Sequence, residues 1–185
     1  LGENTISNTS AQKVLQVLSG NITVIGDGTL NVTGTQYSIN VDNGSWTQNG
    51  ATVTAQALTG PAVLYSKGDF VLNAGSLTGT ATTFIGIQSA AAIKITNGTL
   101  DITAGANALM AGTDILISGG SVTAKAITYN NGKAGGDNAL RANAGITISG
   151  GTVVAEATKT VLGGASLTVA PNVKFGLDLS ENTCS

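Results

Sequence analysis

The chain has 185 residues, of which 10% are charged, and its formal net charge is −2. So few charges argue against a nucleic-acid-binding protein, which needs a basic stripe of Lys and Arg. The sequence has no His and one Cys, Cys184, so neither an internal disulfide nor a Cys/His metal site can form. No apolar run approaches the roughly 20 residues that span a bilayer. We therefore expect no metal, no cofactor, no nucleic-acid partner and no membrane insertion.

The first predicted element is a short helix over residues 10–18, SAQKVLQVL. Its apolar residues lie at helical spacing, and Ser10 is a suitable N-cap. An open solenoid end exposes apolar core and unpaired strand edges. We therefore expect residues 1–19 to form an N-terminal cap over the first coil. The apolar residues of the helix are Ala11, Val14, Leu15 and Leu18.

From residue 20 to residue 170 the chain repeats one pattern, usually at intervals of 22–24 residues. A fixed period of this length is typical of a solenoid, in which each unit stacks on its neighbours to bury its apolar side. The sequence therefore predicts about six coils. The clearest copies are FVLNAGSLTGTA (70–81), IKITNGTLDITA (93–104), ILISGGSVTAKA (115–126) and ITISGGTVVAEA (146–157), and two looser copies lie at 22–34 and 46–57.

Within each copy apolar and polar residues alternate, which indicates strands. A Gly-rich turn separates a first strand from a second, and a third strand precedes the next coil. Three short strands per coil predict an all-β fold, a parallel β-helix with a three-sided cross-section, and parallel crossover connections favour the right-handed form. The turn positions are Gly28, Ala51, Gly75, Gly98, Gly120 and Gly151. The inward positions are Leu30, Val53, Leu77, Leu100, Val122 and Val153 on the second strand and Leu64, Ile87, Leu109 and Leu140 on the third.

The second copy departs from the pattern at two inward positions. Trp46 aligns with Phe70 and Ile115, so we expect it in the core rather than in a binding site. Gln48 aligns with Ile117, and a polar residue at an inward position predicts a local distortion of this coil.

One interval is longer, 31 residues, and the excess lies within 127–142. Solenoid insertions emerge as loops, often on the binding face, although a tolerated surface insertion gives the same signal. Beside this loop the third strands place Tyr65, Gln88, Met110 and Arg141 in one outward column. Tyr65 and Arg141 are then three coils, about 14 Å, apart. The candidate ligand-binding residues of this groove are Tyr65, Gln88, Tyr129, Asn130, Asn131, Asp137, Asn138 and Arg141.

The C-terminal part predicts one more, incomplete coil over residues 166–179. Phe175, Leu177 and Leu179 alternate there and are expected to close the core. Residues 171–185 would then form a C-terminal cap or tail.

Rows of Thr and Ser follow the outward side of the second strand. Thr suits an exposed strand because it is β-branched and polar, whereas regular Thr rows are also typical of an ice-binding plane. Asp101, Lys125 and Glu156 interrupt the rows, which favours the ordinary exposed strand. The first row is Thr29, Thr52, Ser76, Thr99, Ser121 and Thr152.

Many parallel β-helices cleave acidic glycans, which makes a polysaccharide lyase or hydrolase another alternative. Hydrolysis of glycosides requires carboxylates close together. Here the carboxylates are scattered, and Asp101 and Glu156 fall in different columns two coils apart. We therefore expect no enzymatic activity.

The run GGDNALRANAGITISGGTVVAEA (135–157) resembles the repeat of bacterial surface proteins with β-helical carbohydrate-binding or adhesin-like domains, and residues 20–34 resemble the opening coil of the same group. The resemblance implies a β-helix that binds a polysaccharide or glycoconjugate and is secreted or displayed on a bacterial cell surface. We expect a monomeric, non-catalytic module. The alternative is a structural spacer within a larger surface protein.

Overall fold

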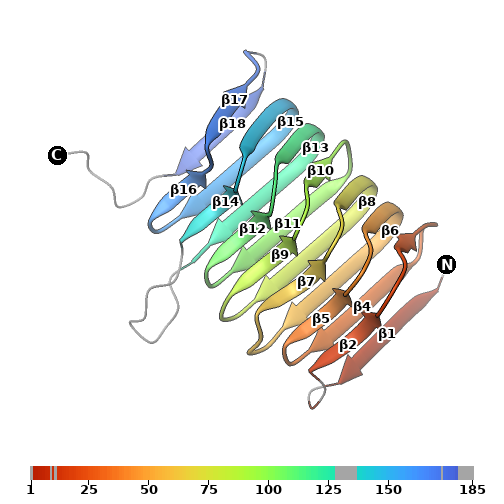
Figure 1. Ribbon diagram of the computed structural model, residues 1–185. Helices are drawn as coiled ribbons and strands as arrows, with labels where there is room; N and C mark the ends of the chain where they lie inside the picture. Colours follow the sequence, from red (N-terminus) through yellow and green to blue (C-terminus); the bar gives the residue numbers. More distant parts are fainter. Residues whose placement is uncertain (1, 9, 11, 128–136, 172, 179–185) are drawn as a thin grey trace.

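The structure is a computed structural model that describes residues 2–8, 10, 12–127, 137–171 and 173–178, the last five by their backbone. The described residues form strands and connecting turns, wound as a parallel β-solenoid (Figure 1). Among them is no helix that could cross a membrane. The all-β parallel solenoid predicted from the repeat is confirmed.

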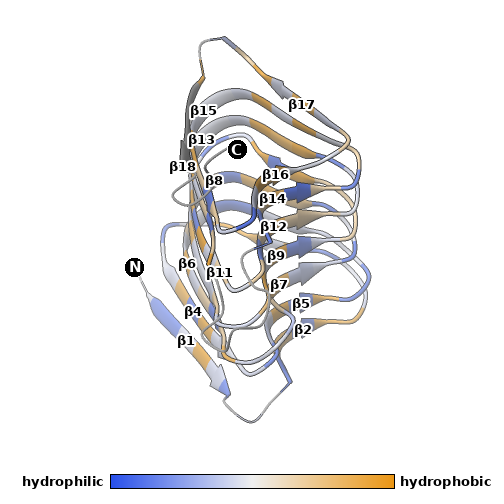
Figure 2. Cartoon of the chain, turned by 90° about the vertical axis from the view of Figure 1, so that its left-hand side faces the viewer, coloured by the Kyte–Doolittle hydropathy of each residue, from blue (hydrophilic) through white to orange (hydrophobic). Residues whose placement is uncertain are grey.

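The strands form two sheets that face each other across the core (Figure 2). The large sheet contains β1 (Glu3–Asn8), β3 (Ile22–Val24), β4 (Thr29–Gly34), β6 (Trp46–Ala57), β8 (Phe70–Ala81), β10 (Ile93–Ile95), β11 (Thr99–Ala104), β13 (Ile115–Ala126), β15 (Gly145–Ala157), β17 (Ser166–Val169) and β18 (Lys174–Asp178). The small sheet contains β2 (Lys13–Val17), β5 (Tyr37–Val41), β7 (Ala62–Ser66), β9 (Ile85–Ser89), β12 (Asn107–Ala111), β14 (Asn138–Ala142) and β16 (Thr160–Gly163).

Each coil contributes three strand segments, as the sequence predicts, but these belong to two sheets. The first and second segments both lie in the large sheet, and in β6, β8, β13 and β15 they continue as one strand through a bend. The expectation of a three-sided cross-section is therefore not supported, and the right-handed winding stays a prediction. Six complete coils run from β3 to β16, with a partial coil (β1 and β2) before them and another (β17 and β18) after them.

Inward columns of apolar side chains build the core between the sheets. Leu77 on β8 pairs in register with Leu100 on β11, which pairs with Val122 on β13. Burial of such columns in every coil supplies the main stabilising free energy of a solenoid. Trp46 lies in the core with 0% of its surface exposed, as predicted. The other predicted inward residues that are fully or nearly fully buried are Val53, Val153, Leu64, Ile87, Leu109 and Leu140.

The predicted capping helix is wrong, because strand β2 occupies Lys13–Val17. Leu15 and Val17 pair in register with Ile39 and Val41 of β5. The third segment of a coil buries two adjacent residues and then one more, as at Gly86, Ile87 and Ser89. That spacing resembles the apolar spacing of one helical face, which explains the error. Ala11, which the predicted helix included, lies outside the described residues.

The bends between first and second segments require a left-handed backbone. Four of the predicted turn glycines have positive φ, namely Gly75, Gly98, Gly120 and Gly151, and so does Ala51 with φ 57°. A Cβ on Gly75 would overlap the carbonyl oxygens of Gly50 and Ala51 in the coil below, so this position needs glycine for two reasons.

In the first coil the turn differs from the prediction by two residues. Gly26 has φ 90°, whereas Gly28 was expected at the turn. Val24 pairs with Gln48 and Thr29 with Thr52, so the first coil has one residue more at this bend than the second.

The predicted last, incomplete coil is confirmed in its backbone. β17 and β18 both pair with β15, and Val153 lies in register with Phe175. Leu179, expected to help close the core, lies outside the described residues.

Candidate functional site

The outer face of the small sheet carries the column of residues predicted for a ligand groove. Tyr65 on β7 pairs with Gln88 on β9, Gln88 with Met110 on β12, and Met110 with Arg141 on β14. The register therefore brings these four residues into one row across adjacent strands. Their side chains are partly exposed, except for Arg141, which is exposed.

The remaining predicted groove residues are only partly described. Asn138 donates a hydrogen bond from Nδ2 to Oδ1 of Asn107, at 3.0 Å. Asp137 accepts a hydrogen bond from Lys159 Nζ at 2.6 Å. Tyr129, Asn130 and Asn131 lie outside the described residues. The part of the groove that the loop would supply therefore stays a prediction.

A pair of tyrosine rings lies toward the N-terminal end of the same face. The ring centroids of Tyr37 and Tyr65 are 6.2 Å apart and the ring planes meet at 64°, an edge-to-face contact. Lys13 on β2 places Nζ 5.8 Å from the centroid of Tyr37, within the range of a cation–π interaction. The third segments of the partial coil and of the first two complete coils therefore build one aromatic surface.

Asp42, one residue after β5, is a shared hydrogen-bond acceptor beside these rings. Lys13 Nζ approaches Oδ1 at 3.1 Å and Oδ2 at 3.4 Å. Gln16 Nε2 donates to Oδ2 at 2.5 Å, and Asn40 Nδ2 donates to Oδ1 at 2.5 Å. We call Lys13, Gln16, Tyr37, Asn40, Asp42 and Tyr65 the aromatic cluster.

The network changes the acidity of two of its members. Hydrogen bonds from Asn40, Gln16 and Lys13 stabilise the ionised form and hold the pKa of Asp42 below its ordinary value of 3.8. Burial raises the pKa of Tyr37 above 10.0, and the ammonium of Lys13 opposes only part of that shift. At neutral pH the carboxyl group of Asp42 is therefore ionised and the phenol of Tyr37 is neutral.

Five members of the aromatic cluster are absent from the groove predicted from sequence. Lys13 and Gln16 were assigned to the capping helix, and nothing in the repeat singles out Tyr37, Asn40 or Asp42. A signal was nevertheless present, since VLQV (14–17) matches VLYS (63–66) of the third segment in the second complete coil. That alignment would have placed Gln16 in the column of Tyr65.

The face offers an apolar surface bordered by polar groups. Half-buried rings present C–H and π surface, Gln16 adds an exposed amide group, and Gln88 adds a partly exposed one. A few placed polar groups around an apolar floor are typical of small-molecule sites. The column from Lys13 through Tyr37 to Asn138 spans five strand spacings, about 24 Å, so an extended ligand could lie across the strands.

The outer face of the large sheet carries the predicted Thr and Ser rows in register. Thr52 pairs with Thr29 and Ser76, and Thr99 with Ser76 and Ser121. Lys125 and Glu156, which interrupt these rows, are neighbours in register and form an ion pair of 3.0 Å. On the first segments of this sheet a hollow of about 330 Å³ lies around the exposed Leu116, bordered by Lys94, Thr96, Ser118, Thr147 and Ser149.

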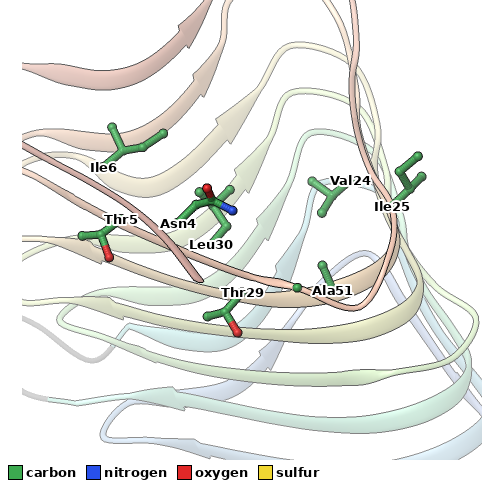
Figure 3. A pocket seen from close by; sticks show the side chains of 9 residues that line it. Asn4, Thr5, Ile6, Val24, Ile25, Thr29, Leu30 and Ala51 are labelled. Carbon is green, nitrogen blue, oxygen red and sulfur yellow. The ribbon is translucent and has the colours of Figure 1, made fainter. Parts of the chain in front are cut away.

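A second hollow, of about 440 Å³, lies at the N-terminal end of the solenoid (Figure 3). It is bounded by β1, the end of β3 and the start of β4, with Asn4, Ile6, Val24 and Ile25 in its wall. Among the described residues, β3 has no first segment of another coil beneath it. The hollow therefore follows from the partial coil, and its wall carries neither a charged nor an aromatic side chain.

Within the described ranges, no three residues of the types Asp, Glu, His and Cys come together in a group that could hold a metal ion.

The sequence model of one protein family, described as "Carbohydrate-binding domain-containing protein", matches residues 38–178 of the chain. The matched range contains five of the six complete coils from their first segment onward, together with Asn40, Asp42 and Tyr65. No curated protein and no solved structure matches the chain.

Proposed function

Because the chain belongs to the family of carbohydrate-binding domain-containing proteins, we propose that the outer face of the small sheet binds a glycan through the aromatic cluster. The observation that carries the proposal is the contact between Tyr37 and Tyr65 beside the hydrogen-bonded carboxylate of Asp42. A sugar ring has an apolar C–H face and a polar rim of hydroxyl groups. The tyrosine rings suit the first, and the polar groups around them suit the second.

Rigid placement of these side chains favours binding. Asn40 is 2% exposed, so it supports Asp42 from below rather than reaching the ligand. The rings of Tyr37 and Tyr65 restrict each other, which lowers the conformational entropy that a ligand must remove. In our proposal, Gln88 and Arg141 continue the site along the column toward the loop.

We propose further that binding is non-catalytic. Of the carboxylates beside this column, Asp42 follows β5 and Asp137 precedes β14, and these two strands are four strand spacings or about 19 Å apart. The carboxylates of inverting glycosidases are about 6.5–9.5 Å apart. We also propose that the protein acts outside the cell or on its surface, where polysaccharides are available as ligands.

Affinity electrophoresis through gels that contain neutral and acidic polysaccharides tests the proposal, followed by calorimetry with oligosaccharides of the retained type. Tyr65→Ala should weaken binding about tenfold or more, since a central aromatic side chain commonly dominates an interface. Tyr65→Phe keeps the ring and should retain most of the affinity. Arg141→Ala tests whether the ligand reaches the fourth strand of the column.

Thr78→Ala is the matched control, because Thr78 is exposed on the opposite, large sheet. This variant should bind as the unchanged protein does. Uniform migration in every gel would refute glycan binding and leave a structural spacer as the function to pursue. Equal loss of affinity in Thr78→Ala and Tyr65→Ala would place the site elsewhere.

A further inference from the structure

We infer that the aromatic cluster takes a neutral glycan and discriminates against glycans that carry carboxylate or sulfate groups. This inference rests on the proposed function and names the chemical class of its ligand. Two features of the cluster support it: the way its hydrogen-bond donors are used, and the partly exposed carboxylate beside the rings.

Within the aromatic cluster, Asp42 engages the strongest hydrogen-bond donors. Its two carboxylate oxygens accept hydrogen bonds from Lys13, Gln16 and Asn40. An anionic sugar needs such donors, above all an ammonium or guanidinium group, to replace the water that it loses. Since Lys13 is already paired with Asp42 at 3.1 Å, a second anion would have to compete for it.

The exposed carboxylate of Asp42 is unfavourable for an anion. Asp42 keeps 27% of its side-chain surface exposed, so its negative charge faces the space in which a ligand would lie. A carboxylate or sulfate group stacked over Tyr37 would come close to Asp42, and like charges at short range repel. A neutral sugar avoids this repulsion.

The acceptors that remain suit hydroxyl groups. Gln16 is exposed and donates to Asp42 through nitrogen, which leaves its carbonyl oxygen as an acceptor. The exposed surface of Asp42 can also accept from a hydroxyl. A neutral sugar is rich in O–H donors, so its hydroxyl groups complement these oxygens, whereas a carboxylate has no donor to offer them.

Lys67 and Arg141 are cations of this face that lie outside the aromatic cluster. Lys67 is exposed and follows β7 at the position beside Asp42. Arg141 is separated from Tyr65 by three strand spacings, about 14 Å. An acidic group bound at Arg141 would therefore not lie over the tyrosine rings, and a variant can distinguish the two positions.

The test compares three neutral probes, cellohexaose, mannohexaose and xylohexaose, each with an acidic partner. The partners of cellohexaose and mannohexaose are their oxidised forms, in which primary alcohols have become carboxylates. The partner of xylohexaose is a xylohexaose substituted with 4-O-methylglucuronate. Calorimetry at neutral pH and low salt gives the affinity ratio for each pair. We expect the neutral member to bind at least about tenfold more tightly, because the acidic member gains no unpaired cation in the cluster.

Two variants should move this ratio in opposite directions. Asp42→Asn removes the negative charge and releases Lys13, so the acidic member should gain affinity relative to the neutral one. Lys13→Met leaves Asp42 without its ammonium, so the acidic member should lose further. Because the ratio is measured within one variant, a general loss of stability does not produce opposite changes.

Tighter binding of the acidic member by the unchanged protein would overturn the inference while leaving glycan binding in place. If Lys67→Met or Arg141→Ala then abolished that preference, the acidic group would be assigned to the cation removed. A ratio that stays constant in Asp42→Asn and Lys13→Met would also overturn it. Failure of all probes and of the polysaccharide gels would instead refute the proposed function itself.

Discussion

The side-chain amide of Gln48 donates a hydrogen bond to the backbone carbonyl oxygen of Ala51, at 3.3 Å. The same nitrogen also approaches the carbonyl oxygens of Gly50 and Ser76, at 3.1 and 2.9 Å. Gln48 and Ala51 both depart from the repeat, in which an apolar residue stands at the position of Gln48 and glycine at the position of Ala51. The buried amide therefore holds the one non-glycine bend with positive φ among the described residues. The distortion expected from Gln48 takes this form.

Ala51→Gly should stabilise the protein. Ala51 has φ 57°, where a Cβ destabilises the folded state by about 1–2 kcal/mol. Glycine removes this strain, but its greater freedom in the unfolded chain offsets about 0.4–1 kcal/mol of the gain. We expect a net gain of about 0.5–1 kcal/mol in the free energy of unfolding, measured by urea denaturation. Gly75→Ala is the converse control and should destabilise strongly, since its Cβ would overlap two carbonyl oxygens. A loss of stability in Ala51→Gly would show that the bend is not strained.

Gln48→Leu should destabilise the protein by about 1–3 kcal/mol, because three backbone carbonyl groups lose a donor. A leucine at this position fits the inward column, since Gln48 lies in register with Leu72 of the next coil. If the amide serves mainly to hold the strained bend, the loss should be smaller in the Ala51→Gly background. A double-mutant cycle should then give a coupling free energy of at least about 0.5 kcal/mol. Additive effects would mean that the two departures from the repeat are independent.

Trp46→Phe should be tolerated far better than Trp46→Ala. The indole Nε1 is buried without a hydrogen-bond partner among the described residues, and Phe70 already occupies the same column one coil further. Phe removes the unpaired N–H while filling most of the volume, so we expect a change within about 1.5 kcal/mol. Ala leaves a cavity and should cost about 3–5 kcal/mol. Unfolding monitored by circular dichroism measures the loss of stability in both variants. Equal losses in Trp46→Phe and Trp46→Ala would contradict the expectation.

The Asp42 network should lose its contribution to stability only in strong acid. The folded pKa of Asp42 lies below 3.8, so the network's contribution is complete above 3.8 and disappears as the pH falls through the folded pKa. Carbon-13 NMR titration of the carboxyl group measures this pKa directly. Asn40→Ala should raise it more than Gln16→Ala, since the hydrogen bond from Asn40 has the largest effect. A folded pKa at or above 3.8 would contradict the network.

Much of the fold could be predicted from the sequence because every coil repeats the same requirements. Inward Leu77 and Leu100 and the bend glycines Gly75 and Gly98 recur at one interval, and each copy supports the others. The structure of the solenoid ends was harder to predict, since a segment that occurs once has no other copies of the repeat to support its alignment. The run VLQV suits a helix face and a third segment equally, and only its pairing with β5 decides between them.

The aromatic cluster could not be predicted in the same way, because its residues occur once. Asp42 has no acidic counterpart in the next coil, where Lys67 follows the third segment. Its importance arises from bonds to Lys13, Gln16 and Asn40, which depend on the register between β2 and β5. The column of Tyr65, Gln88 and Arg141 was accessible from sequence because it follows the repeat, whereas contacts between unlike positions require coordinates.

Met110 and Arg141 are neighbours across two strands, although one coil interval here is 31 residues instead of the usual 22–24. Additional chain between the second and third segments thus leaves the strand pairing unchanged, and the entropic cost of closing a loop rises only slowly with its length. Equivalent corners of successive coils recur about every 4.8 Å. The solenoid is consequently a molecular ruler: foreign peptides inserted at chosen corners would be displayed at spacings fixed in steps of one strand.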